Sequence, residues 1–131
     1  KVFIARDTRS HSAHLSALAV RGASLAGAEA EDFGLLTTPQ LHHIVRMRNI
    51  AAEAELGVET GVKVADAVAW ASEEGYYTML ADAYRTLVAT PQVEGATAAG
   101  RPPLYLDGSC GVGAPKMVLA VGKLNEEAGA P

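Results

Sequence analysis

The sequence predicts an α/β fold, and two observations carry this prediction. Short apolar runs that suit buried strands alternate with longer stretches in which apolar residues recur at spacings of three and four, as in amphipathic helices. The order strand, helix, strand, helix requires crossover connections, which place helices over the faces of a sheet. The length of 131 residues suits a single domain by size.

Capping residues and a proline mark the start of two helices. Ser10 or Ser12 is a plausible N-cap for the first helix, and Thr38 followed by Pro39 is a typical start for the second. The expected elements are a strand at 1–5, a helix at 11–26, a strand at 28–33, a turn at 34–37, a helix at 38–48, a helix at 73–90, a strand at 104–106 and a helix at 115–127.

Composition divides the chain into three stretches. Residues 1–50 carry the regular alternation of strands and helices, and residues 101–131 carry a second strand, turn and helix. Between them, residues 51–100 contain a convincing helix, but the pattern over residues 50–72 predicts no definite element. Proline, glycine and threonine gather in residues 91–103, which we interpret as a linker.

Charge and hydropathy exclude several classes of protein. The net charge of −4, with no clustered basic face, argues against a nucleic-acid-binding protein. No run of about 18 apolar residues is present, which argues against a membrane span. A single cysteine, Cys110, excludes an internal disulfide framework and makes a reducing, cytoplasmic setting the default expectation.

The strongest candidate site is the loop Arg6-Asp7-Thr8-Arg9, which directly follows the first strand. Ligands of open α/β sheets bind at the carboxyl ends of the strands, and guanidinium groups match phosphate through bidentate hydrogen bonds. Asp7 can hold one arginine in place or cap the next helix. A solvated turn with a local ion pair is the alternative interpretation.

Two further segments suit anion binding but have simpler interpretations. At the helix start Thr37-Thr38-Pro39-Gln40, the free N–H groups of the first turn can meet an anion, although an ordinary helix cap explains the same residues. The glycines of residues 107–113 resemble a phosphate-binding turn, yet the segment lacks the lysine and hydroxyl residue of a P-loop. Glycines that permit a tight turn from strand to helix are the alternative.

The remaining chemically reactive side chains predict no site of their own. No cysteine or carboxylate completes a metal-ligand spacing with the histidines, so the sequence predicts no zinc site. Cys110 lies in the glycine turn without a histidine or asparagine pattern that would mark it as a nucleophile. The four histidines are His11, His14, His42 and His43.

Taken in order, these motifs resemble one family. Residues 2–9 resemble the strand and arginine loop of domain 1 of the phosphohexomutases, and residues 32–42, Asp-Phe-Gly-Leu-Leu-Thr-Thr-Pro-Gln-Leu-His, resemble the phosphoacetylglucosamine mutases in particular. Residues 74–77 resemble the start of the helix before domain 2, and residues 104–114 resemble the turn that opens domain 2. The resemblance implies part of a three-layer α/β/α domain, followed by the first strand, turn and helix of a second α/β domain.

The resemblance also implies an activity for the parent enzyme. It would interconvert N-acetylglucosamine 6-phosphate and N-acetylglucosamine 1-phosphate through a phosphoserine, on the route to UDP-N-acetylglucosamine. The expected cofactors are Mg²⁺ and a sugar bisphosphate activator. The expected partners are the sugar-phosphate substrate and the remaining domains of the parent chain, with no nucleic acid and no membrane.

The family's Ser-His-Asn-Pro and Asp-Gly-Asp-Ala-Asp-Arg motifs do not occur in this sequence. We therefore expect an internal, inactive segment that contains no catalytic serine and no metal ligand. The resemblance places Arg6 and Arg9 near the phosphoserine and its phosphate, with Asp7 orienting the loop and Thr38 in an adjacent turn. Ser10-His11 stands where the family usually has Pro-Ser, which predicts a looser loop, and Cys110 replaces a usual Asn.

Two other interpretations stay open. The chain can derive from a phosphohexomutase that acts on glucose or mannose phosphates, or it can be a truncated, non-catalytic interaction module. A truncated sheet exposes apolar faces and unpaired edges. We therefore expect the isolated chain to self-associate or to be marginally stable.

Overall fold

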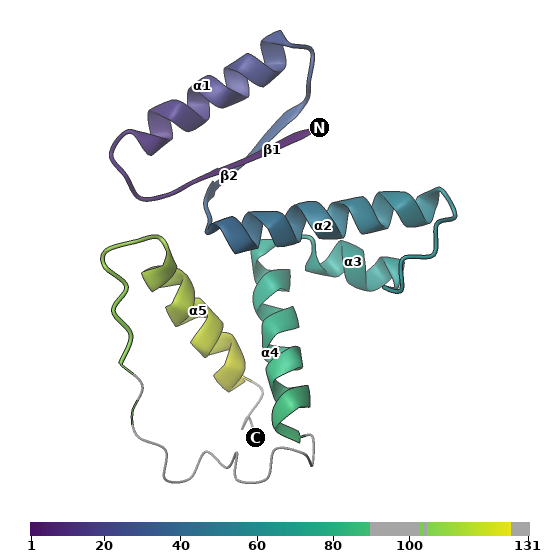
Figure 1. Cartoon of the computed structure of the whole chain (residues 1–131), viewed down its shortest axis with the longest axis vertical. Helices are drawn as coiled ribbons and strands as arrows, with labels where there is room; N and C mark the ends of the chain where they lie inside the picture. Colours follow the sequence, from purple (N-terminus) through teal and green to yellow (C-terminus); the bar gives the residue numbers. More distant parts are fainter. Residues whose placement is uncertain (90–102, 104, 127–131) are drawn as a thin grey trace.

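The structure is a computed structural model that describes residues 1–89, 103 and 105–126. Within this part, no helix combines the length and the apolar character that a membrane crossing requires. The elements, shown in Figure 1, are β1 (Val2–Arg6), α1 (Ser12–Leu25), β2 (Ala30–Leu35), α2 (Thr38–Glu55), α3 (Val64–Trp70), α4 (Glu73–Ala89) and α5 (Gly113–Glu126).

The strands β1 and β2 form a parallel pair joined by α1, as the sequence predicts. Val2 pairs with Ala30, and the register becomes irregular between Ile4 and Arg6, at the carboxyl end of β1. In Figure 1 the two strands lie between α1 and α2, and contacts join α1 to both strands and α2 to β1. The α/β class is therefore confirmed, with helices on either side of a small parallel sheet.

The buried core lies among the helices that follow the sheet. Met47 and Ile50 of α2 pack against Ala67 of α3 and against Ala71, the residue after it. The stretch 50–72, for which the sequence pattern predicts no definite element, thus supplies core residues. The sequence pattern did not reveal these core residues, because small alanines rather than leucines make the contacts between the helices.

The helix α2 is longer than its sequence pattern predicts and begins with a different cap. It runs seven residues beyond the expected end at Arg48, and its N-cap is Thr37 rather than Thr38. The Thr37 hydroxyl accepts from the Gln40 backbone N–H, and the Gln40 side chain accepts from the Thr37 N–H, which completes a capping box. Both hydroxyl residues precede a proline, so sequence alone placed the cap one residue late.

The cap expected for α1 is also different. His11 occupies the N-cap position and makes no side-chain cap hydrogen bond. Ser12 instead donates its hydroxyl to Asp7. The serine that we expected to cap the helix therefore serves the preceding loop.

The strand expected at residues 104–106 does not form at its described positions. Tyr105 is 88% exposed and Leu106 is 58% exposed, and neither pairs with a strand in the described ranges. An apolar run forms a strand only where a neighbour satisfies its backbone groups. Leu104 and nearly all of the linker expected at 91–103 lie outside the described residues, and the helix expected from 115 begins two residues earlier, as α5.

Apolar side chains remain exposed on several helices, and α1 and α5 are clear examples. On α1, Leu18 is 50% exposed and Leu25 is 81% exposed, although the spacing of its leucines predicts one buried face. On α5, Val118 is 71% exposed. These faces are consistent with the expected self-association, which stays a prediction.

Candidate functional site

A cleft of about 700 Å³ opens at the carboxyl ends of β1 and β2. Its walls are the loop after β1, the first turns of α1 and α2, and the turn before α5. This is the edge of a parallel sheet at which ligands of α/β proteins bind. Polar and ionisable lining residues include Arg6, Asp7, Arg9, His11, Ser12, Thr37, Thr38 and His42.

Asp7 organises the arginine loop. One of its carboxylate oxygens accepts from the Arg9 backbone N–H at 3.1 Å and from the Ser12 hydroxyl, and the other lies 3.3 Å from Arg9 Nε. The Ser12 hydrogen bond, followed by the Arg9 backbone hydrogen bond, holds the pKa of the Asp7 carboxyl below its usual value. The aspartate is therefore a fixed anion that ties the loop to the start of α1.

The two arginines offer their guanidinium groups to the cleft from different environments. Arg6 is half-buried and its Nη1 lies 3.5 Å from the Asp7 carbonyl oxygen, a long hydrogen bond. The Arg9 side chain is 74% exposed, and only its Nε contacts Asp7. Most of the guanidinium N–H groups are thus available to an oxyanion, for which their planar geometry is suited.

The first turn of α2 forms the opposite wall. Thr37 caps the helix through Gln40, and Thr38 stands beside it on the cleft surface. A helix N-terminus carries partial positive charge, which adds to the charge of the two arginines. The Gln40 N–H already donates to Thr37 and Pro39 has no N–H, so this wall acts mainly through that charge.

The glycine turn, residues 107–113, closes the cleft from a distant part of the sequence. The Thr8 hydroxyl donates to the Cys110 carbonyl at 3.3 Å, and Val112 lines the cleft. A Cβ atom at Gly108 would lie 2.4 Å from the Ala114 Cβ, so this glycine permits close packing of the turn on α5. These contacts favour the structural interpretation of the turn, in which its glycines allow tight packing.

The structure brings the four predicted site residues, Arg6, Asp7, Arg9 and Thr38, to one cleft, although phosphate binding there stays a prediction. The sequence pattern included Gln40 in this helix start, but its part in the cap was missed. The signal for it was its position three residues after Thr37, which defines a capping box.

Of the four histidines, two line the cleft and one is buried elsewhere. His11, just before α1, and His42, on α2, line the cleft. His43 is buried, and its Nε2 donates to the Trp70 carbonyl at 2.9 Å. His43 is therefore a buried, hydrogen-bonded histidine with a structural role.

Among the residues that the structure describes, no group of three or more histidine, cysteine or acidic side chains is arranged to hold a metal ion. The magnesium ion that the resemblance implies therefore finds no ligand set in the described part of this chain. Its place in the reaction stays a prediction.

Comparison with known proteins identifies the class. Residues 1–58 match the family described as phosphoglucomutase/phosphomannomutase, alpha/beta/alpha domain I. The chain is 33% identical over 117 residues to phosphoacetylglucosamine mutase 2 of Schizosaccharomyces pombe, and 35% identical over 116 residues to the human phosphoacetylglucosamine mutase; these alignments cover 89% and 88% of the chain. The mouse enzyme is 52% identical over 48 residues, which is 37% of the chain and 9% of that enzyme. No solved structure matches the chain significantly.

The chain therefore belongs to the phosphohexomutase family, and within it to the phosphoacetylglucosamine mutases. It spans only 18% of the length of the fission yeast and human relatives. The activity of a whole enzyme is accordingly a matter of proposal.

Proposed function

We propose that this chain supplies one wall of the active site of an enzyme that interconverts N-acetylglucosamine 6-phosphate and N-acetylglucosamine 1-phosphate. The observation that carries the proposal is the cleft that Arg6, Arg9 and the first turn of α2 line together at the carboxyl ends of two parallel strands. The names of the similar proteins supply the reaction class. UDP-N-acetylglucosamine synthesis in the cytoplasm is the setting that this reaction would serve.

The chemistry that the cleft can perform is electrostatic. In phosphoryl transfer, the group that moves carries negative charge on its outer oxygens, and catalysis depends on positioning and on neutralising that charge. Arg6 and Arg9 supply cationic donors, while Asp7 fixes the loop that carries them. In the proposed reaction a phosphoserine gives its phosphoryl group to the sugar monophosphate, and the bisphosphate then returns its other phosphoryl group to the serine.

The serine donor, Mg²⁺ and a sugar bisphosphate activator all belong to this proposal through the resemblance alone. The described residues offer no ligand set for the ion, so no step here is assigned to it. The remaining domains of the parent protein would supply the sugar-binding surface. We expect the 131-residue chain by itself to be inactive.

The test is turnover by the longest native protein that contains these residues. We expect conversion of N-acetylglucosamine 6-phosphate, with Arg9→Ala lowering kcat/KM about 10- to 100-fold, because one charge-assisted hydrogen bond to the phosphoryl group contributes about 1.5–3 kcal/mol. Arg21→Ala is the matched control, since Arg21 is exposed on α1 and does not line the cleft.

Three outcomes would contradict the proposal or redirect it. Preference for glucose or mannose phosphates would identify another phosphohexomutase. Absence of turnover on every hexose phosphate would favour the interaction module, for which the exposed apolar residues of α1 and α5 are the supporting observation. Equal rates for Arg9→Ala and Arg21→Ala would remove Arg9 from the site.

A further inference from the structure

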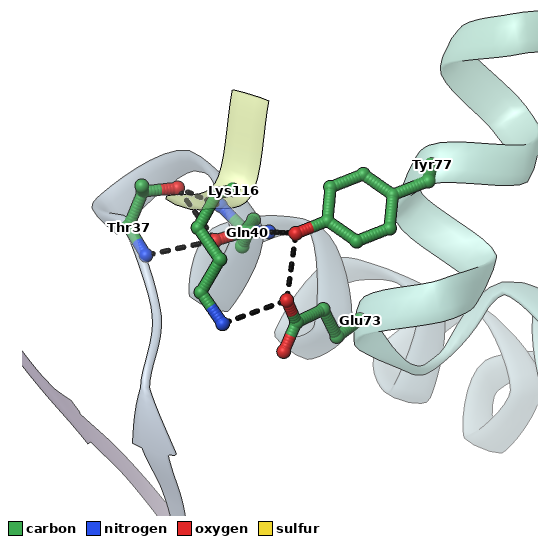
Figure 2. Close-up of polar contacts among 5 residues, drawn as sticks. All are labelled: Thr37, Gln40, Glu73, Tyr77 and Lys116. Carbon is green, nitrogen blue, oxygen red and sulfur yellow. Dashed lines mark hydrogen bonds and ion pairs between the residues drawn. The ribbon is translucent and has the colours of Figure 1, made fainter. Parts of the chain in front are cut away.

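A chain of polar contacts links three helix starts that are far apart in the sequence (Figure 2). Gln40 Nε2 donates to the Tyr77 hydroxyl at 2.8 Å, and that hydroxyl donates to Glu73 Oε1 at 2.6 Å. Lys116 Nζ donates to the same carboxylate oxygen at 2.7 Å. The contacts therefore run from the first turn of α2, through the first turns of α4, to the first turn of α5.

The donors and acceptors of this chain allow only one arrangement. The Thr37 backbone N–H is a donor, so the Gln40 oxygen must face it, at 2.9 Å, and the Gln40 amide nitrogen must face Tyr77. The Tyr77 hydroxyl then accepts from Gln40, which leaves its own proton for Glu73. Burial and the Glu73 hydrogen bond raise the pKa of Tyr77, so the phenol keeps that proton.

Burial makes this arrangement stringent. Gln40 is 1% exposed and Tyr77 is 4% exposed, and no buried side-chain nitrogen or oxygen in the described residues lacks a partner. A polar network that is buried and fully satisfied is stiff, because each broken link strands a polar group away from water. The Lys116 side chain is only 15% exposed, so its ion pair with Glu73 shares this environment.

Both ends of the network are close in sequence to residues that line the cleft. At one end, Thr37 and its neighbour Thr38 line the cleft. At the other end, Lys116 lies four residues after Val112, which also lines the cleft, and six residues after Cys110, whose carbonyl accepts from Thr8. In Figure 1, α5 lies beside α4, and the two helices are in contact. The glycine turn leads directly into α5, which begins at Gly113, so the position of α5 sets the position of the turn.

We propose that Gln40, Tyr77, Glu73 and Lys116 form a positioning relay that seats the glycine turn against the arginine loop and thereby sets the width of the cleft. The four side chains touch no reacting atom; they act through α2 and α5. This inference rests on the proposed function, because it says how the proposed active-site cleft is held at one width. The width can be measured without any substrate, so a failure of the relay and a failure of the proposed activity can be told apart.

The test is the distance between the arginine loop and the glycine turn. Cys110 is the only cysteine of the chain and is exposed, and Ser10 is an exposed position in the arginine loop. With Ser10→Cys added, both positions take nitroxide spin labels, and pulsed electron paramagnetic resonance gives the distance distribution. We expect a single narrow distance distribution when the labelled chain carries no further substitution. Tyr77→Phe should at least double the width of that distribution.

Matched variants separate positioning from folding. Tyr84→Phe makes the same change at a half-exposed tyrosine of α4 and should leave the width unchanged. Lys116→Met cuts the last link without stranding Gln40 and should broaden the distribution, whereas Lys116→Arg keeps the ion pair and should restore the narrow one. Helical content by circular dichroism identifies any variant that unfolds, and the lysine pair then decides.

The proposal is overturned if Tyr77→Phe, folded, gives the same width as Tyr84→Phe. It is also overturned if Lys116→Met and Lys116→Arg give equal widths. Either result would show that the network stabilises only the local contact between α2 and α4 and does not set the width of the cleft.

Discussion

The substitution Gly75→Ala tests how tightly the corner between α3 and α4 is packed. Gly75 is buried at the third position of α4, and its backbone N–H donates to the Ser72 hydroxyl. A Cβ atom there would lie 2.4 Å from the Trp70 Cα and 2.7 Å from the Ala69 carbonyl oxygen. These are backbone atoms, so no side-chain rotation can relieve the overlap, and one helix must shift.

Two opposing effects set the magnitude. Replacing glycine by alanine inside a helix gains about 1 kcal/mol of helix propensity. Overpacking costs about 1–3 kcal/mol, and the upper end applies here because the backbone itself must move. We therefore expect a net loss of about 2 kcal/mol in the free energy of unfolding, close to a 30-fold change in the folding equilibrium.

The assay is urea unfolding followed by the fluorescence of Trp70, the only tryptophan, which borders the overlap. For an m value of about 2 kcal/mol per molar, the midpoint should fall by about 1 M. Gly22→Ala in α1 is the control, because nothing lies within 4 Å of its added Cβ, and it should gain about 0.5–1 kcal/mol. A urea midpoint for Gly75→Ala that equals or exceeds the midpoint of the unsubstituted chain would refute the packing argument.

Urea unfolding also checks two further expectations, the first at one pH and the second over a series of pH values. Thr37→Ala should lose about 1 kcal/mol because it removes the N-cap of α2, whereas Thr38→Ala should change stability by less than about 0.5 kcal/mol; equal losses would contradict the observed cap. Burial, opposed by the hydrogen bond to Trp70, lowers the pKa of His43 below 6.5. The unfolded chain then takes up a proton more readily than the folded chain, so stability should be full above about pH 6.5 and decline as the pH falls further. His43→Gln should flatten that decline and His42→Gln should not; matching profiles for the two variants would exclude His43 as its source.

The alternation of strands and helices over residues 1–48 could be predicted because its signals are local. The apolar run at the N-terminus, the periodic leucines and Thr-Pro punctuation each act within a few residues. The observed boundaries of β1, α1 and β2 differ from the predicted ones by one or two residues. Frayed ends account for shifts of this size.

The core and the third strand could not be predicted because they depend on partners distant in sequence. Ala67 and Ala71 are unremarkable in composition, and only packing on Met47 makes them core residues. Tyr105 and Leu106 have the apolar character of a strand, yet the described residues place no strand beside them. Pattern alone does not reveal which partner is present.

The candidate site divides in the same way. Arg6, Asp7 and Arg9 could be predicted because they follow one strand directly, and the sheet edge then sets their place. The hydrogen bond from Gln40 to Tyr77 spans 37 residues and joins two helices, so no local signal marks it. Glutamine and tyrosine at helical positions are ordinary surface or interface residues until the fold buries them.

The contact between Thr8 and Cys110 has a consequence for the order of folding. It closes a loop of 102 residues, and the entropic cost of such a closure is about 4 kcal/mol on the logarithmic scaling of loop length. The contacts among α2, α3 and α4 close much shorter loops and can form first. We therefore expect the glycine turn to join the cleft last and to leave it first, so its amide hydrogens should exchange well before those around Ile44 and Ala81.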